Sequence, residues 1–360
     1  MSFATATSAV PPSPSTGAAA PRSRSLQLAL FLAAILWYLC AQALSRDAAN
    51  VLELRFDLGC ALPLVHAILL LFFLVCGLTL LRSIEHRRAP LRLTLGLPRR
   101  ATSRAEWATG AALGWGLAVA AVLPMAIART LNVQLWIEPR AFTLLGLSLL
   151  TIAAATLAHA LAFYGYGFQR LIEATGPVRA TLILVALTAV HAAYTATPYG
   201  TPDGTRILIA MLMTLLLSLC WLRTHGLWLL WGVSFAWAAS TAVLFGLPLS
   251  GDNSFSSIVD ARAYGPAWLT GGGYGPAAAL LSILFLLAAL WVLVRATSDY
   301  AWSYTHSPLV PGGYDVTIAP PAAHVAMEQA DESAQTVKHA TLVQILPAAP
   351  QSPGVRTPTE

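Results

Sequence analysis

Apolar stretches of about 20 residues recur along this chain of 360 residues, and they constrain its fold more than any other feature. In the hydrocarbon core of a bilayer every backbone polar group must be satisfied within the protein, so such stretches cross as helices. Charged residues form only 10% of the composition, against roughly 25% in a soluble domain, which is too few to cover a water-facing exterior. We therefore expect an all-α, polytopic transmembrane bundle of about eight spans: Leu26–Leu44, Cys60–Leu81, Trp107–Ala128, Phe142–Leu171, Val178–Thr197, Arg206–Leu222, Gly226–Phe245 and Pro276–Val294.

Arginines between the second and third spans indicate the orientation. Residues 82–106 contain seven arginines and two glutamates, and arginine accumulates in cytoplasmic loops. An even number of spans then places both termini in the cytoplasm and the loop 246–275 outside, in an integral protein of the cell (inner) membrane. The net charge of +5 follows from arginines at the inner membrane face. We therefore expect the lipid bilayer as a partner and no nucleic acid.

The ends of the chain differ in composition from the apolar bundle. Both are rich in Pro and Ala, a composition that buries too little apolar surface to fold. We expect a disordered cytoplasmic N-terminus over residues 1–24, the transmembrane bundle over 25–295, and a largely disordered cytoplasmic tail over 296–360. Residues 91–98 are expected either to lie along the inner membrane surface or to form a solvated linker.

Most glycines and cysteines within the spans are explained by helix packing and do not indicate a catalytic or binding site. Gly110, Gly114 and Gly116 in the third span suit close helix packing better than lipid contact. The four cysteines form no Cys-x-x-Cys pair and are expected to be reduced packing residues. No glycine-rich phosphate loop and no His-Glu-x-x-His occurs, so we expect no cofactor and no metal.

Three segments in the fourth, fifth and seventh spans resemble the motifs of one membrane-protein family. They are His159–Leu171 (HALAFYGYGFQRL), Leu187–His191 (LTAVH) and Gly226–Ala238 (GLWLLWGVSFAWA). In order and separation they are similar to the Glu-Glu-x-x-x-Arg-Gly, Phe-x-x-x-His and His-x-x-x-Asn motifs of the CPBP intramembrane proteases, also called the CAAX-protease or ABI family. The resemblance covers about residues 90–295 and implies that family's transmembrane helical fold.

The charged positions of those motifs are replaced in this chain. His159 and Ala160 stand where the family has its two glutamates, and Tyr164 stands where it has arginine. Ser234 and Ala238 occupy the positions of the histidine and asparagine of the third motif. The residues that match are Phe163, Gly165, His191, Gly232 and Trp237. Of the polar motif positions, His191 is therefore the only one retained.

The resemblance implies endopeptidic cleavage of prenylated CAAX tails or of membrane peptides. In the family a glutamate, or a metal held by Glu and His, activates water, and the remaining polar groups stabilise the oxyanion. Because this chain lacks the carboxylates, we predict a catalytically degenerate pseudoprotease that binds a membrane-embedded or lipidated peptide without cutting it. The predicted pocket contains His159, Tyr164 and Ser234, with His191 as the retained catalytic position.

Other functions remain open from the sequence. An active CAAX-type endopeptidase would use His159 and His191, because imidazole titrates near neutrality. Ser234 as a nucleophile would need a base within hydrogen-bond reach, and spans four to seven contain no Asp or Glu to orient one. A purely structural alternative is that both histidines are neutral, buried and hydrogen-bonded to tyrosines or backbone carbonyls. A membrane scaffold or transport-associated protein is a further alternative, although no inverted repeat supports transport.

Overall fold

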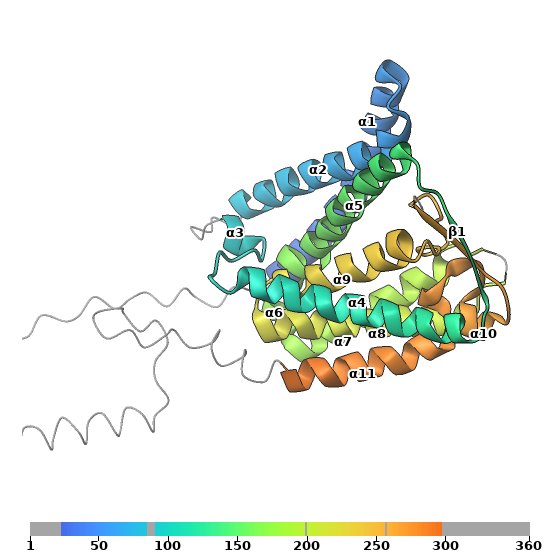
Figure 1. Ribbon diagram of the computed structural model, residues 1–360. Coiled ribbons are helices and arrows are strands. Elements are labelled where there is room, and N and C mark those ends of the chain that lie inside the picture. Colours follow the sequence, from blue (N-terminus) through green and yellow to red (C-terminus); the bar gives the residue numbers. More distant parts are fainter. Residues whose placement is uncertain (1–22, 85–90, 199, 256–257, 297–360) are drawn as a thin grey trace, which may run out of the picture. The chain divides into compact units, whose positions relative to one another are not determined.

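The computed structural model describes residues 23–84, 91–198, 200–255 and 258–296. The chain divides into a unit of residues 1–301, which holds all of these, and a unit of residues 302–360. The predictions of disordered ends fall on residues 1–22 and 297–360, which lie outside the described residues. Within the described part, the predicted bundle is present and predominantly helical (Figure 1).

Six helical segments in the described residues are long and apolar enough to cross a membrane. They are α1 (Arg24–Phe56), η1 with α2 (Gly59–Ala61, Leu62–Ile84), α4 (Ser103–Ile127), α5 with η2 and α6 (Pro139–His159, Ala160–Gly167, Phe168–Thr175), α7 (Pro177–Tyr194) and α8 (Asp203–Thr224). Two shorter apolar helices correspond to the remaining predicted spans: α9 with η3 (Trp228–Ala239, Ser240–Leu244) and α11 (Leu280–Ala296). All eight predicted spans thus fall on apolar helices, and six reach full crossing length.

Large apolar side chains remain on the outer surface of the bundle. Five leucines on the four helices α1, α2, α7 and α11 are each 60–64% exposed: Leu32, Leu36, Leu80, Leu182 and Leu284. Soluble monomers rarely expose contiguous apolar surface on this scale. The surface is compatible with contact to lipid chains around the bundle.

Glycines bring α4 and α9 into backbone contact. A Cβ added at Gly110 would lie 2.1 Å from the carbonyl oxygen of Leu229, and one added at Gly114 would lie 2.2 Å from that of Val233. From the other side, a Cβ on Gly232 would lie 2.3 Å from a carbonyl oxygen of α4. The predicted close packing of the third span is confirmed at Gly110 and Gly114. At Gly116 it is wrong, because nothing lies within 4 Å of an added Cβ there.

The arginine end of the bundle is closed by residues 91–98, which start with the short helix α3 (Leu91–Thr94). Within this segment Thr94 and Leu95 are buried. The Gly96 carbonyl accepts a hydrogen bond from the Leu227 amide at 2.8 Å, and the Pro98 carbonyl accepts one from Trp228 Nε1 at 2.9 Å. The segment therefore packs against the start of α9 and is not a solvated linker.

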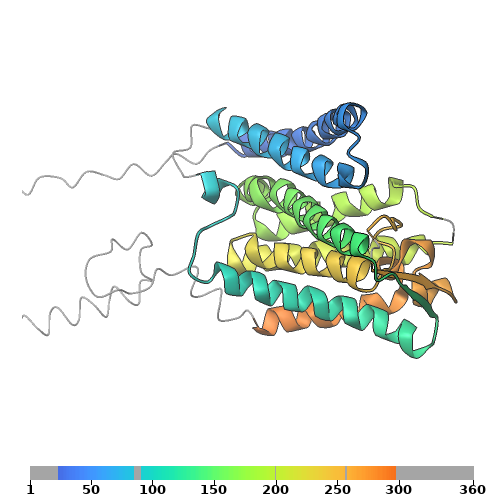
Figure 2. The ribbon, with the colours of Figure 1, turned by 45° about the horizontal axis from the view of Figure 1, so that its top comes forward.

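The opposite end, called the sheet end here, carries a two-stranded antiparallel sheet that the all-α prediction missed. Strand β1 (Leu131–Leu135) pairs with β2 (Val259–Ala263), and Leu131 lies opposite Ala263 (Figures 1 and 2). The strands form because LNVQL and VDARA alternate in polarity, which places Leu131, Ala261 and Ala263 against Val122 and Leu247. Short elements complete this end: α10 (Ala267–Thr270), η4 (Gly272–Tyr274) and η5 (Pro276–Ala278).

Candidate functional site

The first family-like motif lies in a π-helical segment. After α5 ends at His159, residues Ala160–Gly167 form η2, which has the wider hydrogen-bonding of a π-helix before α6 resumes the α geometry. Such segments are rare and occur frequently at functional sites. An added Cβ at Gly165 would lie 2.7 Å from the Leu95 carbonyl oxygen. Glycine is therefore required where η2 passes the segment that closes the arginine end.

The structure places His159 within electrostatic range of His191. The His159 ring at the end of α5 lies 4.7 Å from the Phe163 ring and 6.1 Å from the Tyr164 ring, measured between centroids. His191 on α7 is close enough to interact electrostatically with it. Both histidines are exposed on the bundle surface, and neither imidazole hydrogen-bonds to another described residue. In exposure and hydrogen bonding they differ from the buried, hydrogen-bonded histidines of the purely structural alternative.

Tyr164, at the family's arginine position, is buried and neutral. Its exposed fraction is 2%, and its hydroxyl lies near Thr214 of α8. The Thr214 hydroxyl donates in turn to Thr188 of α7 at 3.1 Å. Thr188 lies three residues before His191, on the same side of α7. Uncharged polar groups of η2, α8 and α7 thus lie close together at this level of the bundle.

Ser234 does not join the two histidines. Its hydroxyl donates to the carbonyls of its own helix, to Leu230 at 3.0 Å and to Trp231 at 3.2 Å. Trp231 Nε1 donates to the Ala153 carbonyl of α5 at 3.2 Å. Because α5 and α9 run in opposite directions, Ser234 lies beyond Ala153, away from His159 (Figure 1). Ala153 and His159 are themselves separated by roughly 9 Å along the helix axis.

Arg170 is a buried residue whose role the sequence did not reveal. Its side chain is fully buried and donates to Gln27 Oε1 on α1 at 3.2 Å and to Glu173 Oε2 at 2.9 Å. Its guanidinium also lies over the Tyr166 ring, 5.1 Å from the centroid. These contacts tie α6 to α1 and balance the charge. The spacing of Arg170 and Glu173 by three residues was the available signal.

Arg206 plays a similar structural part at the sheet end. It is 3% exposed, and its guanidinium donates to the Ala192 carbonyl at 2.6 Å and to the Thr195 hydroxyl at 3.1 Å. Its Nε lies 3.4 Å from Asp203 Oδ1. These bonds hold the end of α7 against the beginning of α8, close to His191. The buried charge is thereby paired and hydrogen-bonded.

His225 lies outside the spans, in the turn between α8 and α9. It has a left-handed backbone conformation with φ of 46°, and its ring lies 5.4 Å from that of Trp221. Burial, and then the positive charge of Arg100, lower the pKa of His225 below its usual value. The neutral imidazole is therefore the form that the folded protein favours.

No metal centre accompanies the histidine pair. Within the described residues no group of three or more His, Cys, Asp and Glu side chains is arranged to hold a metal ion. Compared with known proteins, the chain matches no family model, no curated protein and no solved structure. The resemblance to CPBP proteases therefore rests on the residues of the three motifs and stays a prediction.

Proposed function

We propose that this chain is an integral membrane protein of the CPBP type that binds a membrane-embedded or lipidated peptide at the His159–His191 pair without hydrolysing it. The proposed orientation has the arginine end in the cytoplasm, because arginines concentrate there. The sheet end then lies outside. The observation that carries the proposal is that two exposed histidines, His159 and His191, lie within electrostatic range of each other beside a π-helical segment.

The surroundings of the pair argue against hydrolysis. Between residues 139 and 202 the sequence contains a single acidic residue, Glu173, and its carboxylate is bound by Arg170 at 2.9 Å. Amide hydrolysis requires a group that activates water, such as a carboxylate or a metal-bound hydroxide. Tyr164, at the position of the family's arginine, is a buried and uncharged group. The site therefore keeps polarity and loses the charge that hydrolysis would use.

Binding follows from the unsatisfied imidazoles. A ring N–H that faces hydrocarbon without a partner is costly, because lipid chains accept no hydrogen bond. His159 on α5 and His191 on α7 are both exposed on the surface of the bundle, so a partner can approach laterally from the bilayer. A peptide carbonyl on that partner accepts from an imidazole N–H, and the lipid or apolar side chains pack on the exposed leucines nearby.

The test compares binding with cleavage in one preparation. The purified full-length protein in liposomes is incubated with a farnesylated peptide that carries a photoreactive group, and both cross-linked and cleaved products are quantified. His159→Ala and His191→Ala are each expected to weaken binding roughly fivefold, since one hydrogen bond contributes about 1 kcal/mol. His66→Ala on α2 is the matched control, because it removes another span histidine outside the pair.

Each outcome decides between the candidate functions. Cross-linking without cleavage, weakened by both pair variants and unchanged by His66→Ala, supports the proposal. Cleavage by the wild type that is lost in either pair variant identifies an active endopeptidase instead. Binding that is equal in all four proteins contradicts a site at the histidines and favours a scaffold.

A further inference from the structure

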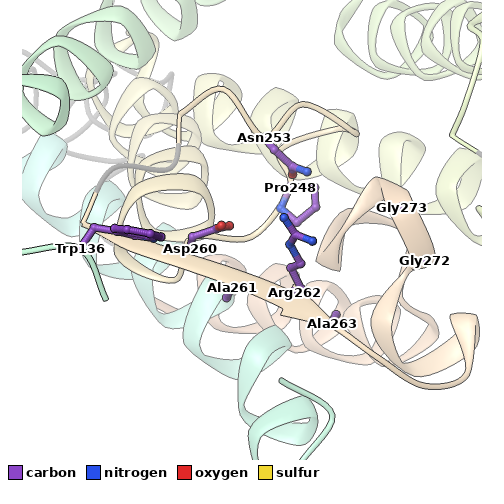
Figure 3. Close-up of a pocket in the computed structure, with 9 residues that line it drawn as sticks. All are labelled: Trp136, Pro248, Asn253, Asp260, Ala261, Arg262, Ala263, Gly272 and Gly273. Atoms are coloured by element: carbon purple, nitrogen blue, oxygen red, sulfur yellow. The ribbon is translucent and has the colours of Figure 1, made fainter. Parts of the chain in front are cut away.

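A polar cavity of about 590 Å³ lies at the sheet end, and none of the residues that line it belongs to the three motifs. Ligand pockets typically measure roughly 300–1,000 Å³. Trp136, Asp260 and Arg262 line it, with Asn253 above and Gly272 and Gly273 on one wall (Figure 3). An added Cβ at Gly272, where φ is +60°, would lie 2.5 Å from the Gly200 carbonyl oxygen. The glycine wall therefore stays free of side chains.

Two opposite charges face this cavity without an ion-pair partner among the described residues. Asp260 and Arg262 are two residues apart on β2, so their side chains leave the same face of the strand, about 6.7 Å apart at the backbone. Their neighbours on β1 are the uncharged Gln134 and Asn132. Neither Asp260 nor Arg262 forms an ion pair or a side-chain hydrogen bond with another described residue. A ligand that carries both signs of charge would satisfy them together.

The side chains around Asp260 differ from those around Arg262, and this difference determines which end of a ligand binds at each residue. Figure 3 shows the Trp136 indole beside the Asp260 carboxylate, whereas the Arg262 guanidinium points toward Pro248 and Asn253. A carboxylate close to an indole is suited to an ammonium group, which pairs with the carboxylate while the indole packs beside it. A guanidinium is suited to a phosphate or carboxylate, which it binds through two parallel N–H donors. The ammonium end therefore belongs at Trp136 and the anionic end at Arg262.

Exposed apolar side chains around the cavity mark the level of the membrane interface. Leu135 and Ile137 on either side of Trp136 are 64% and 74% exposed, and Tyr264 and Trp268 after β2 are 57% and 53% exposed. Tryptophan and tyrosine concentrate at the depth of lipid head groups. We propose that the cavity binds the zwitterionic head group of an outer-leaflet phospholipid, with its phosphate on Arg262 and its ammonium between Asp260 and Trp136.

This inference rests on the proposed membrane embedding and orientation, and it is independent of the histidine pair. The protein can fail to bind a farnesylated peptide and still hold a lipid at the sheet end. The reverse also holds, because the two sites share no residue. Their tests therefore fail separately.

The experiment titrates the purified full-length protein in detergent with short-chain phosphatidylethanolamine and, separately, with phosphatidylglycerol, by calorimetry. Phosphatidylglycerol has the phosphate and lacks the ammonium. The wild type is expected to bind phosphatidylethanolamine about tenfold more tightly. Asp260→Asn should abolish that preference and leave the affinity for phosphatidylglycerol unchanged or stronger. Arg262→Gln should lower the affinity for both lipids about tenfold. Arg140→Gln is the control, an exposed arginine at the same end that does not line the cavity.

The thermal unfolding of every variant is measured in parallel to show that the bundle is intact. Equal affinity of the wild type for both lipids overturns the proposal, as does wild-type binding by Arg262→Gln. A third titration uses glycerophosphoethanolamine, which has the same head group without acyl chains. If it binds as tightly as the lipid, the cavity takes a soluble zwitterion and the assignment to a lipid is wrong.

Discussion

Gly114→Ala is expected to destabilise the bundle, because it places a methyl group where α4 and α9 touch. The added Cβ would lie 2.2 Å from the Val233 carbonyl oxygen and 3.0 Å from the Trp237 amide nitrogen. Both are backbone atoms of a helix, so no side-chain rotation relieves the overlap. The two helices must move apart, and they lose packing along their shared length.

The matched control is Gly116→Ala, two residues along the same helix, where nothing lies within 4 Å of the added Cβ. Replacing a compatible glycine by alanine stabilises a helix by about 0.4–1 kcal/mol, and this gain applies at both positions. Overpacking costs about 1–3 kcal/mol and applies only at Gly114. The free energies of unfolding of the two variants should therefore differ by about 1–3 kcal/mol, with Gly116→Ala the more stable.

The assay is reversible unfolding of the purified protein in mixed micelles, followed by circular dichroism as the fraction of denaturing detergent rises. Gly232→Ala, whose Cβ would lie 2.3 Å from the Trp107 carbonyl oxygen, tests the same contact from α9 and should resemble Gly114→Ala. Equal stability of Gly114→Ala and Gly116→Ala would refute the close packing of α4 on α9.

Three further predictions concern the ends of the bundle. The pKa of His225 is lowered in the folded protein, so the stability that its neutral form gives is full above about pH 6.5 and is lost as the pH falls. Asparagine tolerates the left-handed backbone at this position. His225→Asn should therefore show a smaller drop in thermal unfolding temperature between pH 7.5 and pH 5.5 than the wild type does. Arg206→Gln should destabilise by about 1.5–3 kcal/mol, whereas Asp203→Asn, on the exposed partner, should cost less than about 1 kcal/mol. Gly165→Ala should displace Leu95 and increase proteolytic cleavage within residues 91–98.

Different results would contradict each of these. An unchanged pH dependence in His225→Asn would show that this imidazole does not titrate differently in the folded and unfolded states. Equal losses in Arg206→Gln and Asp203→Asn would mean that the ion pair, and not the bonds to α7, carries the stability. Protection of residues 91–98 in Gly165→Ala would show that η2 does not hold that segment in place.

The helices could be predicted from the sequence because apolar length alone specifies them. The sequence predicts a fourth span over Phe142–Leu171, which is unusually long for one crossing, and the helical segment in the structure is longer still, Pro139–Thr175. Within this segment the geometry changes from α to π over Ala160–Gly167 and then back to α. No periodicity announces that change, because η2 is apolar on every side. The first helix also continues to Phe56, since polar residues beyond the apolar stretch still favour a helix.

The candidate site could be predicted only in part. The spacing of the motifs predicts that His159 and His191 share one site, and in the structure they lie within electrostatic range of each other. The same spacing grouped Ser234 with them, and the structure does not, because helix register depends on packing that single residues do not specify. The sheet-end cavity was missed for another reason: Asp260 and Arg262 stand in a five-residue alternation too short to predict a strand with certainty.

One flank of α11 carries large apolar side chains on the outside of the bundle. Leu284, Leu287 and Trp291 on this helix are 60%, 49% and 63% exposed. In a bilayer this flank borders the acyl chains directly, so the protein should retain a shell of bound lipid along α11 when it is extracted in mild detergent.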